Sequence, residues 1–210
     1  IKAGELLRDQ DVYFAIPGGR GGFTANDFSK YREFIAISDT EVDEPLTEFN
    51  TSVSDQRHKI KEIVDKIRTF LAEISVQIPK GAVLEISHHH GIENFFKTGL
   101  SMITVVNEEY CKKLLFLLPG QCHPEQYHKK KKETFHVIHG NLELQIDGEV
   151  IGLRSGDVQT IKQLERHKFF SKTGCVIEEI SSTHEGSDSF YSDEQINKNK
   201  NRKTLVNFWI

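Results

Sequence analysis

A short stretch in the middle of the chain carries imidazole and carboxylate groups at the spacing that a metal site needs. His128 and Glu133 lie five residues apart, and His167 follows after a turn at Gly156-Asp157. Two imidazoles and one carboxylate leave open positions on a first-row divalent metal ion. Gln126 can add a neutral oxygen, and His123 is a more distant candidate. The alternative on spacing alone is that these histidines face solvent or are satisfied within a core.

The spacing of His128 and Glu133 constrains the local backbone. On one regular strand their side chains would point to opposite faces, so we predict a bulge or turn within residues 129–132. Beyond it, Glu133 shares a face with Phe135 and Val137. A carboxylate beside apolar residues is costly to bury unless it binds something.

Composition limits the classes of protein that the chain can be. It has 210 residues, 37% of them hydrophobic, which suffices for one core and a small appendage. A net charge of −4 gives no general attraction to nucleic acid or to an anionic membrane. No apolar run approaches the roughly 18–20 residues of a membrane span. The chain opens on Ile1 and its one methionine is Met102, so we expect a piece of a larger protein.

The cysteines suggest a reducing compartment, and we expect the cytoplasm. They are three in number and scattered, which argues against a disulfide framework. Cys122 lies next to the candidate ligands and is expected to be a reduced structural thiol. A reactive or metal-binding role is the alternative, but no CxxC pairing supports zinc.

The pattern of apolar residues predicts a mainly β protein with one amphipathic helix. Residues 55–75 carry apolar side chains at three- and four-residue steps, with Ser54 as a plausible N-cap. Short strands follow at the spacing of a sandwich or barrel, at 83–87, 99–106, 113–118, 158–161, 169–171 and 175–181. We therefore divide the chain into an irregular N-terminal segment (1–50), a helical linker packing on the barrel (51–80) and a barrel domain (81–210). Residues 183–204 read as a polar tail, and 205–210 as a segment that docks back.

The candidate ligands also resemble the cupin signature. Gly120, Gln126-Tyr127-His128, Glu133 and Gly140 fit its first element, and Gly156-Asp157 with His167 fits its second. The resemblance implies a jelly-roll barrel. The sequence departs from the signature at Gln126, where histidine is usual, and at Lys162 and Leu164, where proline and glycine are usual. The first departure bears on the identity and affinity of the metal, and the second only on a turn.

A closer resemblance covers nearly the whole chain, which looks like the C-terminal cupin of sialic acid (N-acetylneuraminate) synthase-like proteins. It rests on the segments 87–92, 109–113, 118–121, 123–125, 132–135, 178–181 and 202–204. Residues 1–7 and 11–17 resemble the segment that follows the catalytic TIM barrel of those synthases. Such a barrel is absent here, so synthase activity is not expected from this piece. That cupin is in turn similar to D-lyxose ketol-isomerases.

The resemblance implies a mechanism and a set of site residues. In lyxose isomerase-like cupins a divalent metal, typically manganese or zinc, polarises a sugar while a carboxylate moves a proton between C1 and C2. By motif, His128, Glu133 and His167 match metal ligands, and Gln126 takes the remaining ligand position. Glu179 is the candidate acid/base, with Glu178 the alternative if the strand parity is reversed. Lys130 is a candidate to approach the sugar oxygens, unless residues 129–132 form only a solvated basic rim.

Three functions remain open from the sequence. The first is a metal-dependent sugar ketol-isomerase or epimerase module in sugar or surface-polysaccharide metabolism. The second is a non-catalytic sugar-binding or regulatory cupin attached to a synthase, which Gln126 favours. The third is a structural dimerisation domain, because pairing covers exposed sheet edges, and a homodimer is expected. One of the three adjacent histidines 88–90 is a candidate to cover the barrel mouth, since all three cannot face one site.

Overall fold

The computed structural model describes residues 1–16, 18, 20–29, 31–199 and 201–210, so Pro17 of the run 11–17 lies outside the described residues. The chain divides into two compact units, Ile1–Glu62 and Ile63–Ile210. The boundary between them falls within helix α1 (Arg57–Ile74), between the two divisions that the sequence suggested. No helix in the described part of the chain combines the length and the apolarity needed to cross a bilayer.

The first unit is more regular than the sequence indicated. Strands β1 (Leu6–Leu7), β2 (Arg32–Ala36) and β3 (Thr51–Asp55) form an antiparallel sheet, with the short 3-10 helix η1 (Asp9–Asp11) after β1. Phe34 is buried at its centre, stacked on Phe28 at 4.3 Å between ring centroids and met edge-on by Phe23 at 5.2 Å. These strands are too short and too polar for periodicity to reveal them.

Helix α1 follows the predicted range closely. The buried side chains of Ile63, Ile67 and Leu71 form the apolar stripe that the spacing indicated. The predicted N-cap is wrong, because Ser54 belongs to β3 and pairs with Glu33 of β2. The carboxylate of Asp55 instead accepts a hydrogen bond from the backbone N–H of Arg57 (3.1 Å), one of the donors that a helix leaves without an internal partner.

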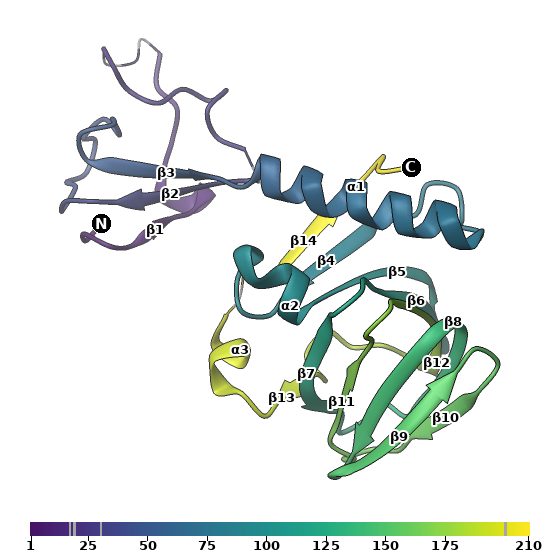
Figure 1. The fold of residues 1–210 in the computed structure, drawn as a ribbon. Coiled ribbons are helices and arrows are strands. Elements are labelled where there is room, and N and C mark those ends of the chain that lie inside the picture. The colour runs from purple at the N-terminus through teal and green to yellow at the C-terminus, as the bar shows by residue number, and fades with distance from the viewer. Residues whose placement is uncertain (17, 19, 30, 200) are drawn as a thin grey trace. The chain divides into compact units, whose positions relative to one another are not determined.

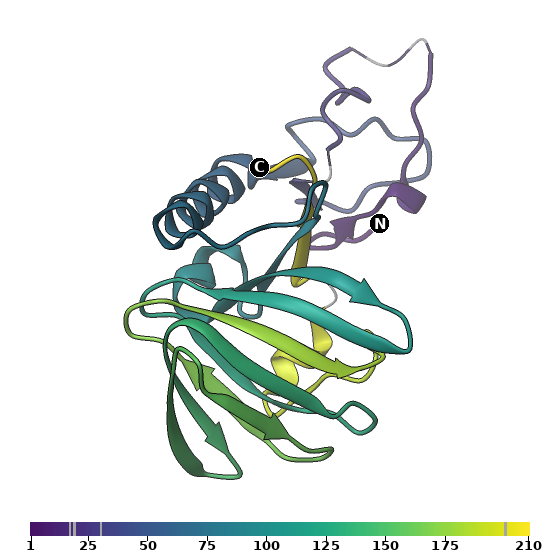
Figure 2. The same cartoon turned by 90° about the vertical axis from the view of Figure 1, so that its right-hand side faces the viewer.

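The second unit is a curled antiparallel β-sheet, as a jelly-roll barrel requires, which confirms the predicted mainly β fold class. Figure 1 and Figure 2 show its strands wrapped into a barrel-like shape. Its elements are β4 (Leu84–His88), η2 (Ile92–Asn94), α2 (Phe95–Thr98), β5 (Gly99–Asn107), β6 (Tyr110–Leu117), β7 (Cys122–Tyr127), β8 (Glu133–Ile146), β9 (Glu149–Arg154), β10 (Val158–Ile161), β11 (His167–Phe170), β12 (Cys175–Ser182), β13 (Phe190–Tyr191), α3 (Glu194–Lys198) and β14 (Lys203–Val206).

The long strand β8 lies between β11 and β12 and so connects the two halves of the sheet. Along the sheet the strands run β13-β7-β11-β8-β12-β6-β5-β4-β14, and β9 and β10 also pair with β8. The core between the two halves includes Leu115, Phe135, Val137, Phe169 and Ile177. Since side chains alternate across a strand, the face of β8 that supplies Phe135 and Val137 also carries Glu133 inward, as the sequence predicted.

The C-terminal segment is ordered into structure rather than a simple polar tail. It contributes β13 beside β7 and β14 beside β4, with α3 between them. Trp209 is buried and its indole Nε1–H donates a hydrogen bond to the carbonyl oxygen of Ala82 (2.8 Å), so the end of the chain docks back as expected. The same segment brings Tyr191 and Arg202 to the pocket described next, and it places Asp188 beside His128.

Candidate functional site

A break between β7 and β8 brings His128 and Glu133 to the same side. Strand β7 ends at Tyr127 and β8 begins at Glu133, which confirms the predicted interruption within residues 129–132. The carboxylate of Asp188 holds the break by accepting backbone N–H groups from residues 129, 130 and 131 at 2.9–3.2 Å. Burial opposes ionisation of Asp188, but these bonds together outweigh it and lower the pKa of the carboxyl group. The turn is thus fixed by a residue sixty positions away.

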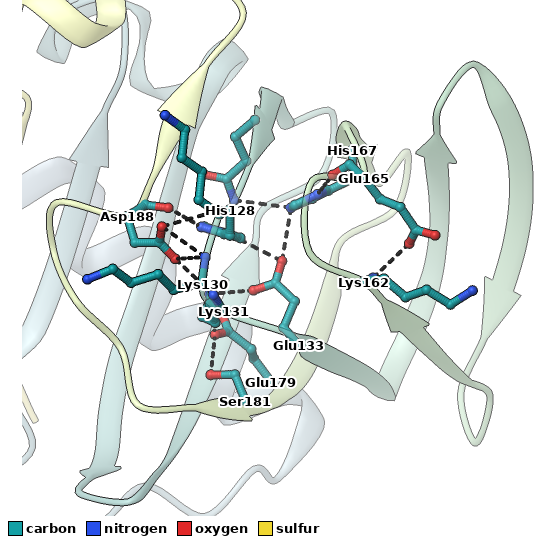
Figure 3. A network of polar contacts seen from close by, with 12 residues as sticks. His128, Lys130, Lys131, Glu133, Lys162, Glu165, His167, Glu179, Ser181 and Asp188 are labelled. Atoms are coloured by element: carbon teal, nitrogen blue, oxygen red, sulfur yellow. Dashed lines mark hydrogen bonds and ion pairs between the residues drawn. The ribbon is translucent and has the colours of Figure 1, made fainter.

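His128, Glu133 and His167, which we call the ligand triad, converge in the interior of the barrel (Figure 3). One ligand atom from each lies within 4.8 Å of the others, and all three residues are buried. Glu133 Oε1 is 2.9 Å from His167 Nε2 and 3.5 Å from His128 Nε2. His167 comes from β11, where it pairs in register with Gln126 of the neighbouring β7.

The backbone decides which nitrogen of each imidazole faces the carboxylate. His128 Nδ1 lies 2.7 Å from the carbonyl oxygen of Asp188, and His167 Nδ1 lies 3.1 Å from that of Glu165. A carbonyl only accepts, so each Nδ1 carries a hydrogen, and in a neutral ring each Nε2 then presents a lone pair. Neither His128 Nε2 nor Glu133 Oε1 has a hydrogen-bond partner among the described residues. Three acceptor atoms therefore face one another, an arrangement that a bound cation would satisfy.

Lys131 links Glu133 to Glu179. Its buried ammonium contacts Glu133 Oε2 closely and lies 2.8 Å from Glu179 Oε1, which also accepts a hydrogen bond from Ser181. Burial opposes the charged form of Lys131, but Glu179 and Glu133 outweigh it and raise its pKa. Burial likewise favours the neutral acid at Glu133, yet the charge of Lys131 is the largest opposing cause and the pKa of Glu133 lies well below its usual range. Lys131, Glu133 and Glu179 together carry a net charge of −1, which suits a divalent cation.

The parity of β12 settles which of two adjacent glutamates faces this cluster. Glu179 is buried and lies opposite Phe135 of β8 and Lys113 of β6. Glu178 faces outward, where Lys112 and His136 contact its carboxylate at 2.6 and 3.3 Å. Glu179 lines a small pocket with the triad histidine His128, together with residues of β4, β5, β6, β7, β11 and the C-terminal segment. The free space there is about 40 Å³, little more than the volume of one water molecule.

The other predicted site residues take varied positions. Gln126 is buried with its amide nitrogen 3.3 Å from His167 Nε2, beside the triad. His123 lines the pocket, stacked on Phe169 at 4.5 Å, and burial above all lowers its pKa well below the usual value. The structure does not bring Lys130 to the pocket: its side chain is 69% exposed and its ammonium pairs with Glu185 at 2.6 Å. Cys122 is half-buried, which raises its thiol pKa.

The three adjacent histidines connect the barrel to the C-terminal segment. His88 Nε2 contacts the Thr204 hydroxyl (3.2 Å), and His90 Nε2 contacts the Asp193 carboxylate (3.1 Å). His89 lies between the carbonyl of Thr98 and the hydroxyl of Tyr191. Each imidazole of the run thus has a partner outside the pocket lining.

Sequence reasoning missed several residues of the site. Lys131 was hidden in a run of four lysines, where composition does not say which one turns inward. Asp188, Tyr191 and Arg202 lie in the segment interpreted as a polar tail. Lys113 was expected only as the first residue of a strand, yet it is 4% exposed and lines the pocket. Alternation along β6 from Leu115 would have placed its side chain inward.

Comparison with known proteins identifies relatives of this chain. Residues 114–177 match the family described as "Cupin domain". The chain is similar to the D-lyxose/D-mannose isomerase of Thermosediminibacter oceani, with 27% identity over 174 residues that cover 68% of this chain and 96% of that protein. It is also similar to the D-lyxose ketol-isomerase of Cohnella laeviribosi, with 27% identity over 51% of this chain and 75% of that protein. The chain therefore contains a cupin domain with homology to D-lyxose isomerases.

Solved structures show the same fold at lower identity. A mutant L-ribose isomerase from Acinetobacter sp. in complex with L-ribose superposes with a TM-score of 0.57 at 14% identity, covering 70% of this chain and 96% of that one. The ligand-free L-ribose isomerase of Cellulomonas parahominis gives a TM-score of 0.56 at 14% identity, covering 67% and 94%.

Proposed function

We propose that this chain is a metal-dependent sugar isomerase module that interconverts an aldose and a ketose of the lyxose or mannose type. The observation that carries the proposal is the convergence of three acceptor atoms, Nε2 of both triad histidines and Oε1 of Glu133, in a buried site whose Nδ1–H groups are already engaged. Homology to proteins named D-lyxose isomerases supports the choice of reaction.

The ligand triad fits a divalent ion, with manganese or zinc as the proposed metals. His128, Glu133 and His167 would hold it, and Gln126 would complete the set after its amide turns to present oxygen. When bound, such an ion acts as a Lewis acid on the carbonyl and hydroxyl oxygens of a sugar. Lys131 stays on Glu133 Oε2, so Oε1 remains the ligand atom and the orientation of the carboxylate is fixed.

Glu179 is the proposed acid/base. It is buried, it lines the pocket, and Lys131 and Ser181 both engage its Oε1. The carboxylate removes the proton from C2 of an aldose and returns it to C1 of the resulting enediol, while the hydroxyl proton of O2 passes to O1. Lys131 holds Glu179 close to the triad, and we propose that Lys131, rather than Lys130, approaches the sugar oxygens.

The adjacent residues Glu179 and Glu178 allow the proposed acid/base to be tested with a control substitution on the same strand. We expect the purified chain to bind Mn²⁺ or Zn²⁺ and, in D₂O, to exchange the C2 proton of D-lyxose or D-mannose. Glu179→Gln should lower the exchange rate by about 10²–10⁴, the usual contribution of a positioned acid/base, with metal content unchanged. Glu178→Gln alters an outward carboxylate of the same strand and should leave exchange within about twofold. A chain that folds without binding either metal, or equal rates in the two variants, would refute the proposal.

A non-catalytic sugar-binding cupin is the second candidate, and Gln126 favours it. An amide replaces the histidine of the cupin signature beside His167, which weakens the ligand set. If binding alone is the function, metal and sugar bind but no C2 exchange occurs. Gln126→His should then raise metal affinity by on the order of tenfold, equivalent to about 1.4 kcal/mol, without starting exchange. Exchange by the natural chain decides against this candidate.

The wider context of the module is proposed from the sequence resemblance. We propose that the cupin belongs to a sialic acid synthase-like protein whose TIM-barrel domain lies outside this chain, and that it pairs as a homodimer. Three scattered cysteines support a reducing compartment, so we place the protein in the cytoplasm. Sedimentation of the chain tests the dimer directly, since a stable monomer at micromolar concentration would exclude it.

A further inference from the structure

Two cationic side chains line the pocket without a partner for their charge, and we call Lys113 and Arg202 the cationic pair. Lys113 is 4% exposed, and its ammonium makes no hydrogen bond or ion pair within the described part of the chain. Arg202 Nη1 is buried and likewise has no hydrogen-bond partner among the described residues. A buried charge without a partner is costly, so a natural protein retains one for a reason.

The fold brings the cationic pair to the same cavity from distant parts of the sequence. Lys113 lies on β6, directly opposite Glu179 on β12, so both side chains point to the same face of the sheet. Arg202 immediately precedes β14, and its guanidinium carbon lies 5.0 Å from the ring centroid of Tyr191. That stacking fixes the guanidinium but neutralises no charge.

The carboxylates near the pocket are already shared with other cations. Lys131 uses Glu133 and Glu179, and Lys203 pairs with Glu85 at 2.7 Å. Four cations thus stand against three carboxylates, which leaves one positive charge in excess. A divalent ion in the ligand triad would raise that excess to three.

The local titration behaviour agrees with a positive interior. His184 lines the same pocket, and burial, followed by the charges of Lys113 and Lys131, lowers its pKa to about 4. Burial is also the first cause that lowers the pKa of Lys113, and Glu179 only partly offsets it. A neutral sugar would leave both members of the cationic pair without a counter-charge.

We propose that Lys113 and Arg202 form a subsite for an anionic group of the substrate, so that the pocket takes an acidic sugar, a sugar phosphate or a uronate, in preference to a neutral aldose. That the ligand is a sugar rests on the proposed function, whereas that it carries an anionic group rests on the cationic pair alone. Phosphate and carboxylate share the required chemistry, because both accept charge-assisted hydrogen bonds from an ammonium and a guanidinium.

Calorimetric titration of the metal-loaded chain with D-mannose, D-mannose 6-phosphate and D-mannuronate tests the subsite. We expect at least one charged sugar to bind about tenfold or more tightly than D-mannose, and which of the two does so identifies the anion. Lys113→Met keeps the volume of the side chain and removes its charge, and Arg202→Gln does the same for the guanidinium. Each should reduce the advantage of the charged sugar to within about twofold. Lys168→Met removes an exposed charge that does not line the pocket and should preserve the advantage.

The outcomes separate this inference from the proposed isomerase. Equal affinities for the three sugars, no binding of any of them, or an advantage that survives in both folded variants would overturn the anionic subsite. Circular dichroism and thermal melting establish folding, and Arg202→Lys serves if Arg202→Gln does not fold. Proton exchange at C2 is measured in parallel. Exchange on D-mannose with no charged preference upholds the isomerase and overturns the subsite. A charged preference without any exchange upholds the subsite and overturns the isomerase.

Discussion

Glu133 and Lys113 are both buried charged residues of one barrel, yet Glu133 contacts three charged or ionisable neighbours whereas Lys113 has no ion-pair partner among the described residues. The neighbours of Glu133 are oriented in turn, His128 and His167 by backbone carbonyls and Lys131 by Glu179. The ligand triad is therefore preorganised by the fold, and an ion that binds there need not rearrange it. The cationic pair has no ion-pair partner among the described residues, which is the condition expected of groups that meet their counter-charge on a ligand.

Removing Glu133 gives the largest effect that this comparison predicts. Glu133→Gln deprives the triad of its charged ligand and leaves Lys131 with Glu179 alone. We expect Mn²⁺ or Zn²⁺ affinity to fall by more than the roughly 10–100-fold typical of losing an outer partner of a metal ligand, with loss of C2 exchange. The metal-free chain should also lose about 3 kcal/mol of stability, as when one partner of a buried ion pair is removed.

The stability effect of Lys113→Met is the one to compare with that of Glu133→Gln, because both substitutions remove a buried charge. Because Lys113 is buried without a partner, replacing its ammonium by an apolar group of similar length should leave the free energy of unfolding unchanged or raise it by about 1 kcal/mol. Urea denaturation of the two metal-free variants gives both values. Equal destabilisation by the two substitutions would erase the contrast between the triad and the cationic pair.

A smaller effect is expected from the turn that holds His128 in place. Asp188→Asn keeps the backbone carbonyl that orients His128 but weakens the carboxylate bonds to the N–H groups of residues 129–131. We expect a loss of about 1–3 kcal/mol in stability and about tenfold in metal affinity. Asp193→Asn, at the start of α3, is the control, because its carboxylate is exposed and outside the pocket. A normal metal affinity in Asp188→Asn would mean that the triad keeps its geometry without the turn.

The sequence was sufficient to predict that the three residues of the ligand triad converge. Strand parity and the cupin signature both concern residues that are close together in the chain or whose spacing is set by a known motif. Glu133, Phe135 and Val137 alternate as a half-buried strand must, and His167 follows a glycine turn. The choice between Glu178 and Glu179 remained open because parity is lost wherever a strand boundary is uncertain by one residue.

The remaining parts of the site depend on contacts that no local pattern records. Lys131 rather than Lys130 turns inward because Asp188, from the far end of the barrel domain, fixes the turn. Arg202 reaches the pocket only because β14 pairs with β4, a strand more than a hundred residues earlier in the chain. A polar segment whose residues are satisfied by distant partners has the same composition as a disordered tail, so composition could not distinguish them.

Acid should reveal a further difference in stability, through histidines that the fold keeps neutral. Burial lowers the pKa of His89 to about 4, against about 6.5 in the unfolded chain. Between those values the unfolded chain binds the additional proton, so stability is fully present above pH 6.5 and falls as the pH drops towards 4. One such group accounts for about 2–3 kcal/mol across that range.

Thermal melting of the natural chain and of His89→Gln between pH 7 and pH 4 measures the pH-dependent stability that His89 contributes. The variant loses the contacts to Thr98 and Tyr191, so it should be less stable at pH 7. Its stability should nevertheless decline less steeply with falling pH, because unfolding of the variant takes up about one proton fewer. His123 and His184 account for the pH dependence that remains. Parallel curves for the two proteins would mean that His89 is not kept neutral by burial. The C-terminal segment would then tolerate a charged imidazole beside Tyr191, just as the pocket tolerates Lys113.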